Sequence, residues 1–212
     1  MGVYRVFRRF GLGGVVSERA GAVMRMFGLT VERLGEVGVR HECRVEIKAG
    51  EIVYITGPSG SGKSVLLREL AEAVGGSEIV RLEDVELDGE RRVIDCVGGD
   101  FLEGLRLLST AGLNDVWCLL NRPSRLSEGQ QWRFRLAVAM GAGKGFVFAD
   151  EFCSRLDRVT AAVICYNVRK FARRRGVGFV LASSHRDILR DLEPDVLIVN
   201  ELSGGCSVKR GS

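Results

Sequence analysis

The chain has 212 residues, which is enough for one domain with a substantial core and hardly enough for two. Apolar residues make up 46% and charged residues 27%, so a largely disordered chain is excluded. The net charge of +4 permits a nucleic-acid partner without requiring one. No apolar run approaches the roughly 20 residues of a membrane-spanning helix, so a role at a membrane would need an anchoring partner chain.

The first 28 residues are rich in arginine, with a single acid at Glu18. An Arg-rich, acid-poor start is also typical of an organelle transit peptide. We favour a basic extension over residues 1–28 that packs on the domain or contacts a partner. A domain over residues 29–205 and a tail over residues 206–212 would follow it.

A phosphate-binding loop follows the first buried-type strand, Glu51 to Thr56. Eight residues in succession fit the pattern GxxxxGK[ST]: Gly57, Pro58, Ser59, Gly60, Ser61, Gly62, Lys63 and Ser64. Glycines let backbone N–H groups converge on phosphate oxygens, and the N-terminus of the next helix adds partial positive charge. We expect Lys63 to reach the β- and γ-phosphates and the Ser64 hydroxyl to bind Mg²⁺.

The middle of the chain alternates between expected helices and strands. A helix is predicted over residues 64–74, two strands joined by a turn at Asp88–Gly89 over residues 79–95, and further helix over residues 101–121. An amphipathic helix is predicted over residues 130–140. Alternation of this kind favours a mostly parallel sheet covered on both faces.

The acidic pair Asp150 and Glu151 ends the apolar strand from Phe146 to Ala149. A carboxylate at such a strand end can enter the Mg²⁺ shell, which is the role we expect for Asp150. The adjacent Glu151 can polarise the attacking water. A helix over residues 160–175 and strands over residues 178–183 and 195–200 complete the pattern.

Three further segments resemble motifs of the ABC-type ATPases. Residues 126–130, LSEGQ, are similar to the family signature LSGGQ, and residues 154–157, SRLD, to its D-loop. The run Ser183-Ser184-His185 ends a strand, as the family's switch histidine does. The resemblance covers roughly residues 50–200. It implies an α/β P-loop NTPase fold with a helix-flanked, mostly parallel sheet, an antiparallel edge and a reduced helical subdomain at about residues 97–135.

The resemblance also implies how the residues work together. ATP, with Mg²⁺, would lie between the P-loop of one subunit and Ser127, Glu128, Gly129 and Gln130 of the other, in a head-to-tail homodimer. Glu151 would be the general base, Lys63 and His185 would contact the γ-phosphate, and Ser154 and Asp157 of the D-loop would link the two sites.

The sequence departs from the family pattern in several places. Glutamine occurs only at 130 and 131, so the Q-loop glutamine is missing, and Asp95 is the nearest positional match for a metal contact through water. The usual adenine-stacking aromatic is also missing, and Arg33 or Phe27 could substitute. The stretch between the P-loop and the signature is short for a transporter subunit.

These departures favour a cytoplasmic, nucleotide-gated clamp or motor acting on a non-membrane partner, either nucleic acid or protein. The alternative is the ATP-binding subunit of an ABC membrane transporter.

Overall fold

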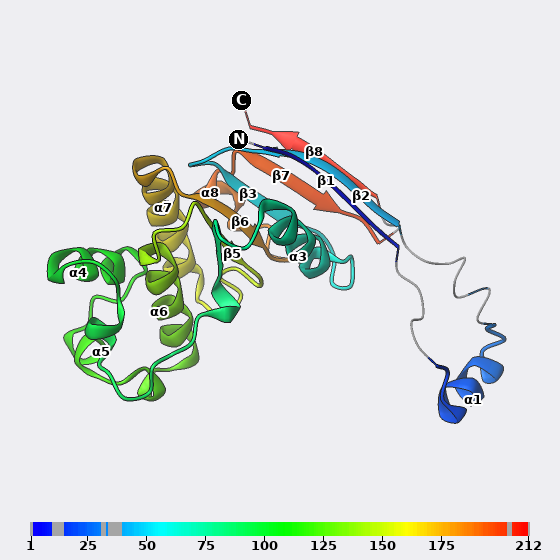
Figure 1. Cartoon of the computed structure of the whole chain (residues 1–212), viewed down its shortest axis with the longest axis horizontal. Coiled ribbons are helices and arrows are strands. Elements are labelled where there is room, and N and C mark those ends of the chain that lie inside the picture. The colour runs from blue at the N-terminus through cyan, green and yellow to red at the C-terminus, as the bar shows by residue number, and fades with distance from the viewer. Residues whose placement is uncertain (1, 10–14, 31–32, 34–39, 203–204, 212) are drawn as a thin grey trace.

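The computed structural model describes residues 2–9, 15–30, 33, 40–202 and 205–211. Its centre is a six-stranded sheet with the strand order β4-β5-β6-β3-β7-β8 (Figure 1). The strands are β3 (Ile52–Thr56), β4 (Ile79–Arg81), β5 (Phe146–Ala149), β6 (Gly178–Ala182), β7 (Val196–Asn200) and β8 (Cys206–Arg210). All neighbouring pairs are parallel except β7 with β8. This confirms the predicted mostly parallel sheet with an antiparallel edge.

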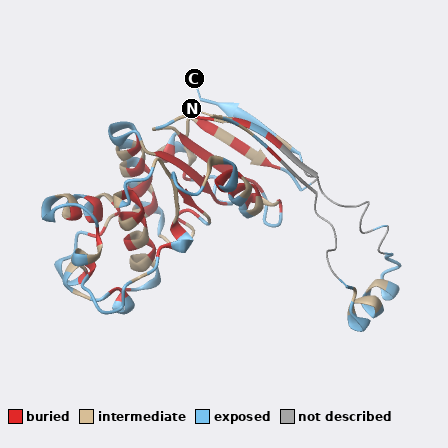
Figure 2. Ribbon diagram, viewed as in Figure 1, coloured by how far each residue is buried: buried red, intermediate tan, exposed pale blue. Residues whose placement is uncertain are grey.

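Helices cover both faces of this sheet because its strands are apolar on both sides. Within β3, Val53 and Ile55 pack with α3 (Lys63–Val74), while Ile52 and Tyr54 belong to the core on the opposite face. That second core includes buried residues of α6 (Glu128–Gly141) and α7 (Arg158–Arg175). Figure 2 shows the buried positions concentrated along the strands and the inward helix faces.

The helical subdomain lies at one side of the molecule, where Figure 1 shows α4 and α5. The predicted helix over residues 101–121 is two helices, α4 (Phe101–Thr110) and α5 (Val116–Leu120). The break falls at Gly112, which has a φ of 80° in the left-handed region, and Asp115 then caps α5. Three 3₁₀ turns occupy Leu82–Asp84, Val93–Cys96 and Pro123–Arg125, and the short α8 spans Leu189–Leu192.

Both ends of the chain are integrated into sheets, which differs from the expected boundaries at residues 28 and 206. Strand β1 (Gly2–Arg9) pairs antiparallel with β2 (Arg40–Ile47), with Gly2 opposite Ile47. Strand β8 pairs with β7, and Arg210 binds Glu51 through an ion pair of 2.8 Å. Residues 2–9 and 206–210 are therefore strands of the domain, because their main-chain groups complete neighbouring strands.

The helix α1 (Glu18–Met26) lies apart from the sheets in Figure 1 and has no buried residue. Ser17 caps it by accepting a hydrogen bond from the Ala20 N–H. Among the described residues, no helix has both the length and the apolar character needed to cross a bilayer.

Candidate nucleotide-binding site

Neighbouring parallel strands bring the predicted site residues to one edge of the central sheet. The P-loop follows β3, Asp150 and Glu151 follow β5, and His185 comes shortly after β6. The carboxyl ends of parallel strands lie at the same edge, which is where α/β proteins bind ligands. The strand order therefore assembles segments that are far apart in the sequence.

The P-loop wraps around the side chain of Lys63. This side chain is 7% exposed, and its Nζ donates to the carbonyl oxygens of Gly57 at 3.1 Å and Pro58 at 2.9 Å. Helix α3 begins at Lys63, after Gly62 with a φ of 84°. Its first N–H groups have no acceptor within the helix, so this end of α3 and the ammonium together form an anion-binding cradle.

Gly57 is required by close packing. A Cβ at this position would lie 2.3 Å from the Asn200 carbonyl oxygen and 2.8 Å from Ser61 Oγ. We expect Gly57→Ala to destabilise the fold by about 3 kcal/mol, because backbone must move. Thermal unfolding should show a fall in Tm of roughly 6–12 °C. The matched control is Gly76→Ala, where an added Cβ meets nothing within 4 Å. Equal Tm values for the two variants would contradict this assignment.

Asp150 and Glu151 turn sharply away from β5. The Asp150 carboxylate accepts a hydrogen bond of 2.9 Å from the Glu151 N–H. Glu151 is exposed and has a φ of 48°, a left-handed conformation that is uncommon for glutamate. Strained backbone of this kind clusters at functional sites, where surrounding structure maintains it. The turn places the Glu151 carboxylate in solvent, where water is available to it.

His185 is half exposed, with 50% of its side chain accessible. Its N–H donates to Ser183 Oγ at 3.3 Å, and its carbonyl accepts a hydrogen bond of 2.6 Å from the Tyr54 hydroxyl. Desolvation raises the pKa of Tyr54, so the phenol stays protonated and keeps this hydrogen bond. The loop that carries His185 is thereby fixed to β3.

The D-loop residues lie just before α7. Asp157 caps this helix by accepting a hydrogen bond of 2.9 Å from the Thr160 N–H. The hydrogen bonds from the Thr160 hydroxyl and N–H lower the pKa of Asp157, so it is a charged cap. Ser154 donates its N–H to the Glu151 carbonyl at 3.0 Å, which ties the D-loop to the acidic turn.

The signature segment forms the exposed start of α6. Ser127 and Gln130 make a reciprocal capping box, in which the Ser127 N–H donates to Gln130 Oε1 at 2.9 Å. Glu128 is paired with Arg155 at 3.6 Å. None of residues 127–130 lines the pocket beside Ser64. Within one chain, the signature segment and that pocket are therefore separate.

The structure brings Glu83, and not Asp95, to Asp150. The Asp150 N–H donates to Glu83 Oε1 at 2.6 Å, and both residues line a cavity of about 170 Å³ together with Ser64. Asp95 lies on the 3₁₀ turn Val93–Cys96 and does not line this cavity. Glu83 keeps contact with solvent, and the partial desolvation of its carboxylate raises its pKa.

The reason for this difference is the length of β4. Strands were expected across residues 79–95, but β4 ends at Arg81, which lies opposite Phe148 of β5. Glu83 comes two residues after Arg81, just as Asp150 comes two residues after Phe148, so these two acids follow neighbouring strands at the same level. The sequence carries only a weak signal for it: the acidic pair Glu83–Asp84 is separated by two residues from the apolar pair Ile79–Val80, whereas Asp150 directly follows Ala149.

Comparison with known proteins agrees with these motifs. The sequence profile of the ABC transporter family matches residues 41–97. The methionine import ATP-binding protein MetN of Bordetella pertussis is 30% identical over 205 residues, which cover 79% of this chain and 55% of that protein. MetN 2 of Pseudomonas aeruginosa strain PAO1 is 29% identical over 212 residues, which cover 83% and 62%.

The chain belongs to the ABC-type ATPase family. It spans about half to three fifths of the length of these curated relatives. Its ABC fold is also seen in a dimeric ATP-binding cassette solved in a post-hydrolysis state with ADP and phosphate. That structure has a TM-score of 0.69 and 19% identity, with 100% of both chains covered.

The ABC family implies a Mg²⁺ ion beside the nucleotide, and the residues present fit one. Ser64, Glu83 and Asp150 line the same cavity and supply a hydroxyl and two carboxylates. Oxygen donors of this kind are those that Mg²⁺ prefers.

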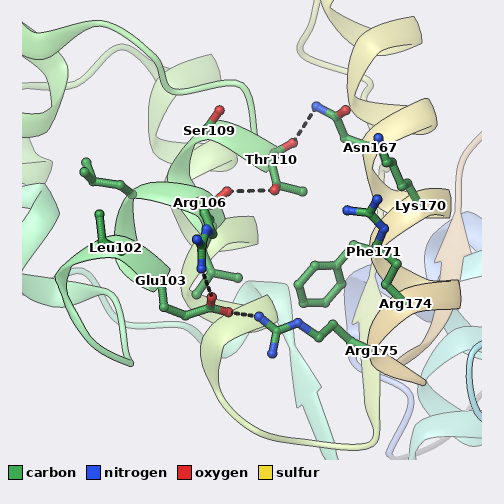
Figure 3. Close-up of a pocket in the computed structure, with 12 residues that line it drawn as sticks. Leu102, Glu103, Arg106, Ser109, Thr110, Asn167, Lys170, Phe171, Arg174 and Arg175 are labelled. Carbon is green, nitrogen blue, oxygen red and sulfur yellow. Dashed lines mark hydrogen bonds and ion pairs between the residues drawn. The ribbon is translucent and has the colours of Figure 1, made fainter.

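A larger hollow of about 550 Å³ in this ABC chain lies between α4 and α7 (Figure 3). Glu103 is paired there with Arg106 and Arg175, and Asn167 Nδ2 donates to the Thr110 carbonyl at 3.0 Å. No P-loop residue, and neither Asp150 nor Glu151, lines it. The candidate nucleotide site is therefore the smaller cavity at the sheet edge.

Proposed function

We propose that this ABC chain binds Mg-ATP and hydrolyses it at a head-to-tail dimer interface. One observation carries the proposal: the sheet order brings the P-loop, Asp150–Glu151 and His185 to the same edge. Phosphoryl transfer to water needs mainly positioning and electrostatic stabilisation, which such a cradle supplies. The experiments on Lys63 and Glu151 in the Discussion test it.

Each residue has a defined task in this scheme. The N–H groups at the start of α3 hold phosphate oxygens, while Lys63 exchanges its carbonyl acceptors for the β- and γ-phosphates. Ser64 and Asp150 hold Mg²⁺, which neutralises charge on the phosphate oxygens when bound. Glu151 orients the attacking water and accepts its proton. His185 donates to the γ-phosphate from the loop after β6.

The second half of each site comes from the partner subunit. Helix α6 is 14 residues long and begins at the exposed residues Ser127 and Glu128, so its positive N-terminal end can attract an anion from a partner. Ser127 and Gly129 of one subunit would donate to the γ-phosphate held by the P-loop of the other. ATP is then the bridge that closes the dimer, and loss of its γ-phosphate opens it.

We expect Ser127→Arg to bind ATP normally and to fail to dimerise. An arginine at the start of α6 would obstruct the interface and place a cation at the positive end of the helix. The substitution is made in the Glu151→Gln protein, and the mass is measured by light scattering with Mg-ATP. Ser124→Arg, also at an exposed serine, is the matched control and should dimerise. Normal dimerisation of the Ser127→Arg protein would refute the composite site.

We further propose that the process served is membrane transport. The matched relatives are methionine import ATP-binding proteins, which supports the ATP-binding subunit of a transporter over the soluble clamp expected from the sequence. The short segment between P-loop and signature supports the clamp as the second candidate.

Two measurements separate these candidates. If the chain is a transporter subunit, detergent extracts should yield it bound to a multi-spanning membrane protein that stimulates its ATPase rate. A clamp on nucleic acid should instead bind duplex DNA with an affinity that falls steeply as salt rises. DNA binding of that kind, without a membrane partner, would overturn the transport proposal.

A further inference from the structure

We propose that Glu83 is a ligand of the metal that accompanies ATP, so that this site holds its metal with two carboxylates. The inference rests on the proposed function, since it concerns the same metal. It differs from the family resemblance, which implies a neutral glutamine near this metal. Glu83, and not Asp95, would then take the place of the missing Q-loop glutamine.

The position of Glu83 follows from strand pairing. Strands β4 and β5 are parallel neighbours, so the residues that follow them emerge side by side. Glu83 Oε1 accepts the Asp150 N–H at 2.6 Å, which fixes the Glu83 side chain against the turn that carries the metal-binding carboxylate. Ser64, from the start of α3, lines the same cavity of about 170 Å³. Three oxygen-bearing side chains from three elements therefore meet in one small space.

The basic side chains around this cavity leave the carboxylates of Glu83 and Asp150 available to bind a cation. Arg81 and Arg68 also line it, but Arg81 donates to the Arg68 carbonyl oxygen at 3.5 Å. Within the described part of the chain, neither Glu83 nor Asp150 forms an ion pair with a basic side chain. Hard divalent cations favour carboxylate oxygens, so a cation is the natural counter-charge for this pair.

A purely structural role for Glu83 makes a different prediction. The bond from the Asp150 N–H needs only an acceptor oxygen, which the amide of a glutamine supplies equally well. A metal ligand needs the negative charge. Glu83→Gln therefore separates the roles, because it keeps the acceptor and the shape and removes the charge. Glu86→Gln is the matched control, because Glu86 is an exposed glutamate three residues further on that does not line this cavity.

The experiment measures ATP affinity for the whole chain by calorimetry, once with Mg²⁺ and once with EDTA. For Glu83→Gln we expect the gain in affinity given by Mg²⁺ to fall about tenfold, as for other changes around a metal site. With EDTA its ATP affinity should equal or exceed that of the wild type, because a carboxylate that repels phosphate is gone. Glu86→Gln should differ from the wild type by less than about twofold in ATP affinity in both conditions.

The remaining outcomes are distinct. The metal role would be overturned if Glu83→Gln lost the same ATP affinity with Mg²⁺ as with EDTA. It would also be overturned if Mg²⁺ raised the ATP affinity of Glu83→Gln as much as that of the wild type. Mn²⁺ binding followed by electron paramagnetic resonance gives a second readout, in which Glu83→Gln should weaken the Mn²⁺-ATP complex by a similar factor. A wild-type protein that binds no ATP in either condition would instead overturn the proposed function itself.

Discussion

Lys63→Ala should lower ATP affinity by about 100-fold or more, since a buried, charge-assisted contact to two phosphates is lost. The Gly57 and Pro58 carbonyls hold the Lys63 ammonium inside the P-loop. Residues 57–64 contain no other basic side chain that could replace it. Fluorescent-nucleotide titration measures the affinity, and circular dichroism checks that the variant is folded.

The control for this substitution is Lys144→Ala. Lys144 is also bonded to a carbonyl, that of Ser77 at 2.7 Å, but lies outside the nucleotide cavity. The Lys144→Ala protein should bind ATP with the affinity of the wild type. If folded Lys63→Ala protein bound ATP within about twofold of the wild type, the P-loop assignment would be wrong.

Glu151→Gln should lower the ATP turnover rate by about 100-fold or more and still bind Mg-ATP. The amide keeps the size of the side chain but cannot accept a proton from water, while the phosphate cradle is unchanged. The bound nucleotide should then accumulate in the closed state. Light scattering should report a monomer without nucleotide and a dimer with Mg-ATP.

Glu72→Gln is the matched control, because Glu72 is exposed on α3 and outside the cavity beside Ser64. It should hydrolyse ATP at the wild-type rate. Equal turnover of Glu151→Gln and wild type would exclude Glu151 as the base. A monomer under both conditions would mean that a different chain completes the site.

Much of the sheet edge could be predicted because short-range patterns encode it. The P-loop lies between a fully buried strand and a helix, and the Asp150–Glu151 pair ends another buried strand, as the sequence indicated. Parallel pairing then dictates that these ends meet. The left-handed backbone of Glu151 could not be foreseen, because glutamate has no local preference for it.

Glu83 was missed because three residues make a weak strand signal. The turn residues Asp88–Gly89 favoured a hairpin, whereas the chain leaves the sheet at Leu82 and continues as 3₁₀ turns. Only the pairing of β4 with β5 identifies Glu83 as the residue next to Asp150. The integration of both chain ends was missed for a similar reason, since their strands are defined by long-range partners and β8 is largely exposed.

Those paired end strands fix where each end of the chain emerges. Gly2 lies opposite Ile47, just before β3 begins, and Arg210 lies opposite Val196 at the start of β7. Figure 1 shows the two ends close together. The strand register places them near the starts of β3 and β7, whereas the P-loop follows the end of β3. A fluorescent label or affinity tag attached at either end would therefore point away from the nucleotide.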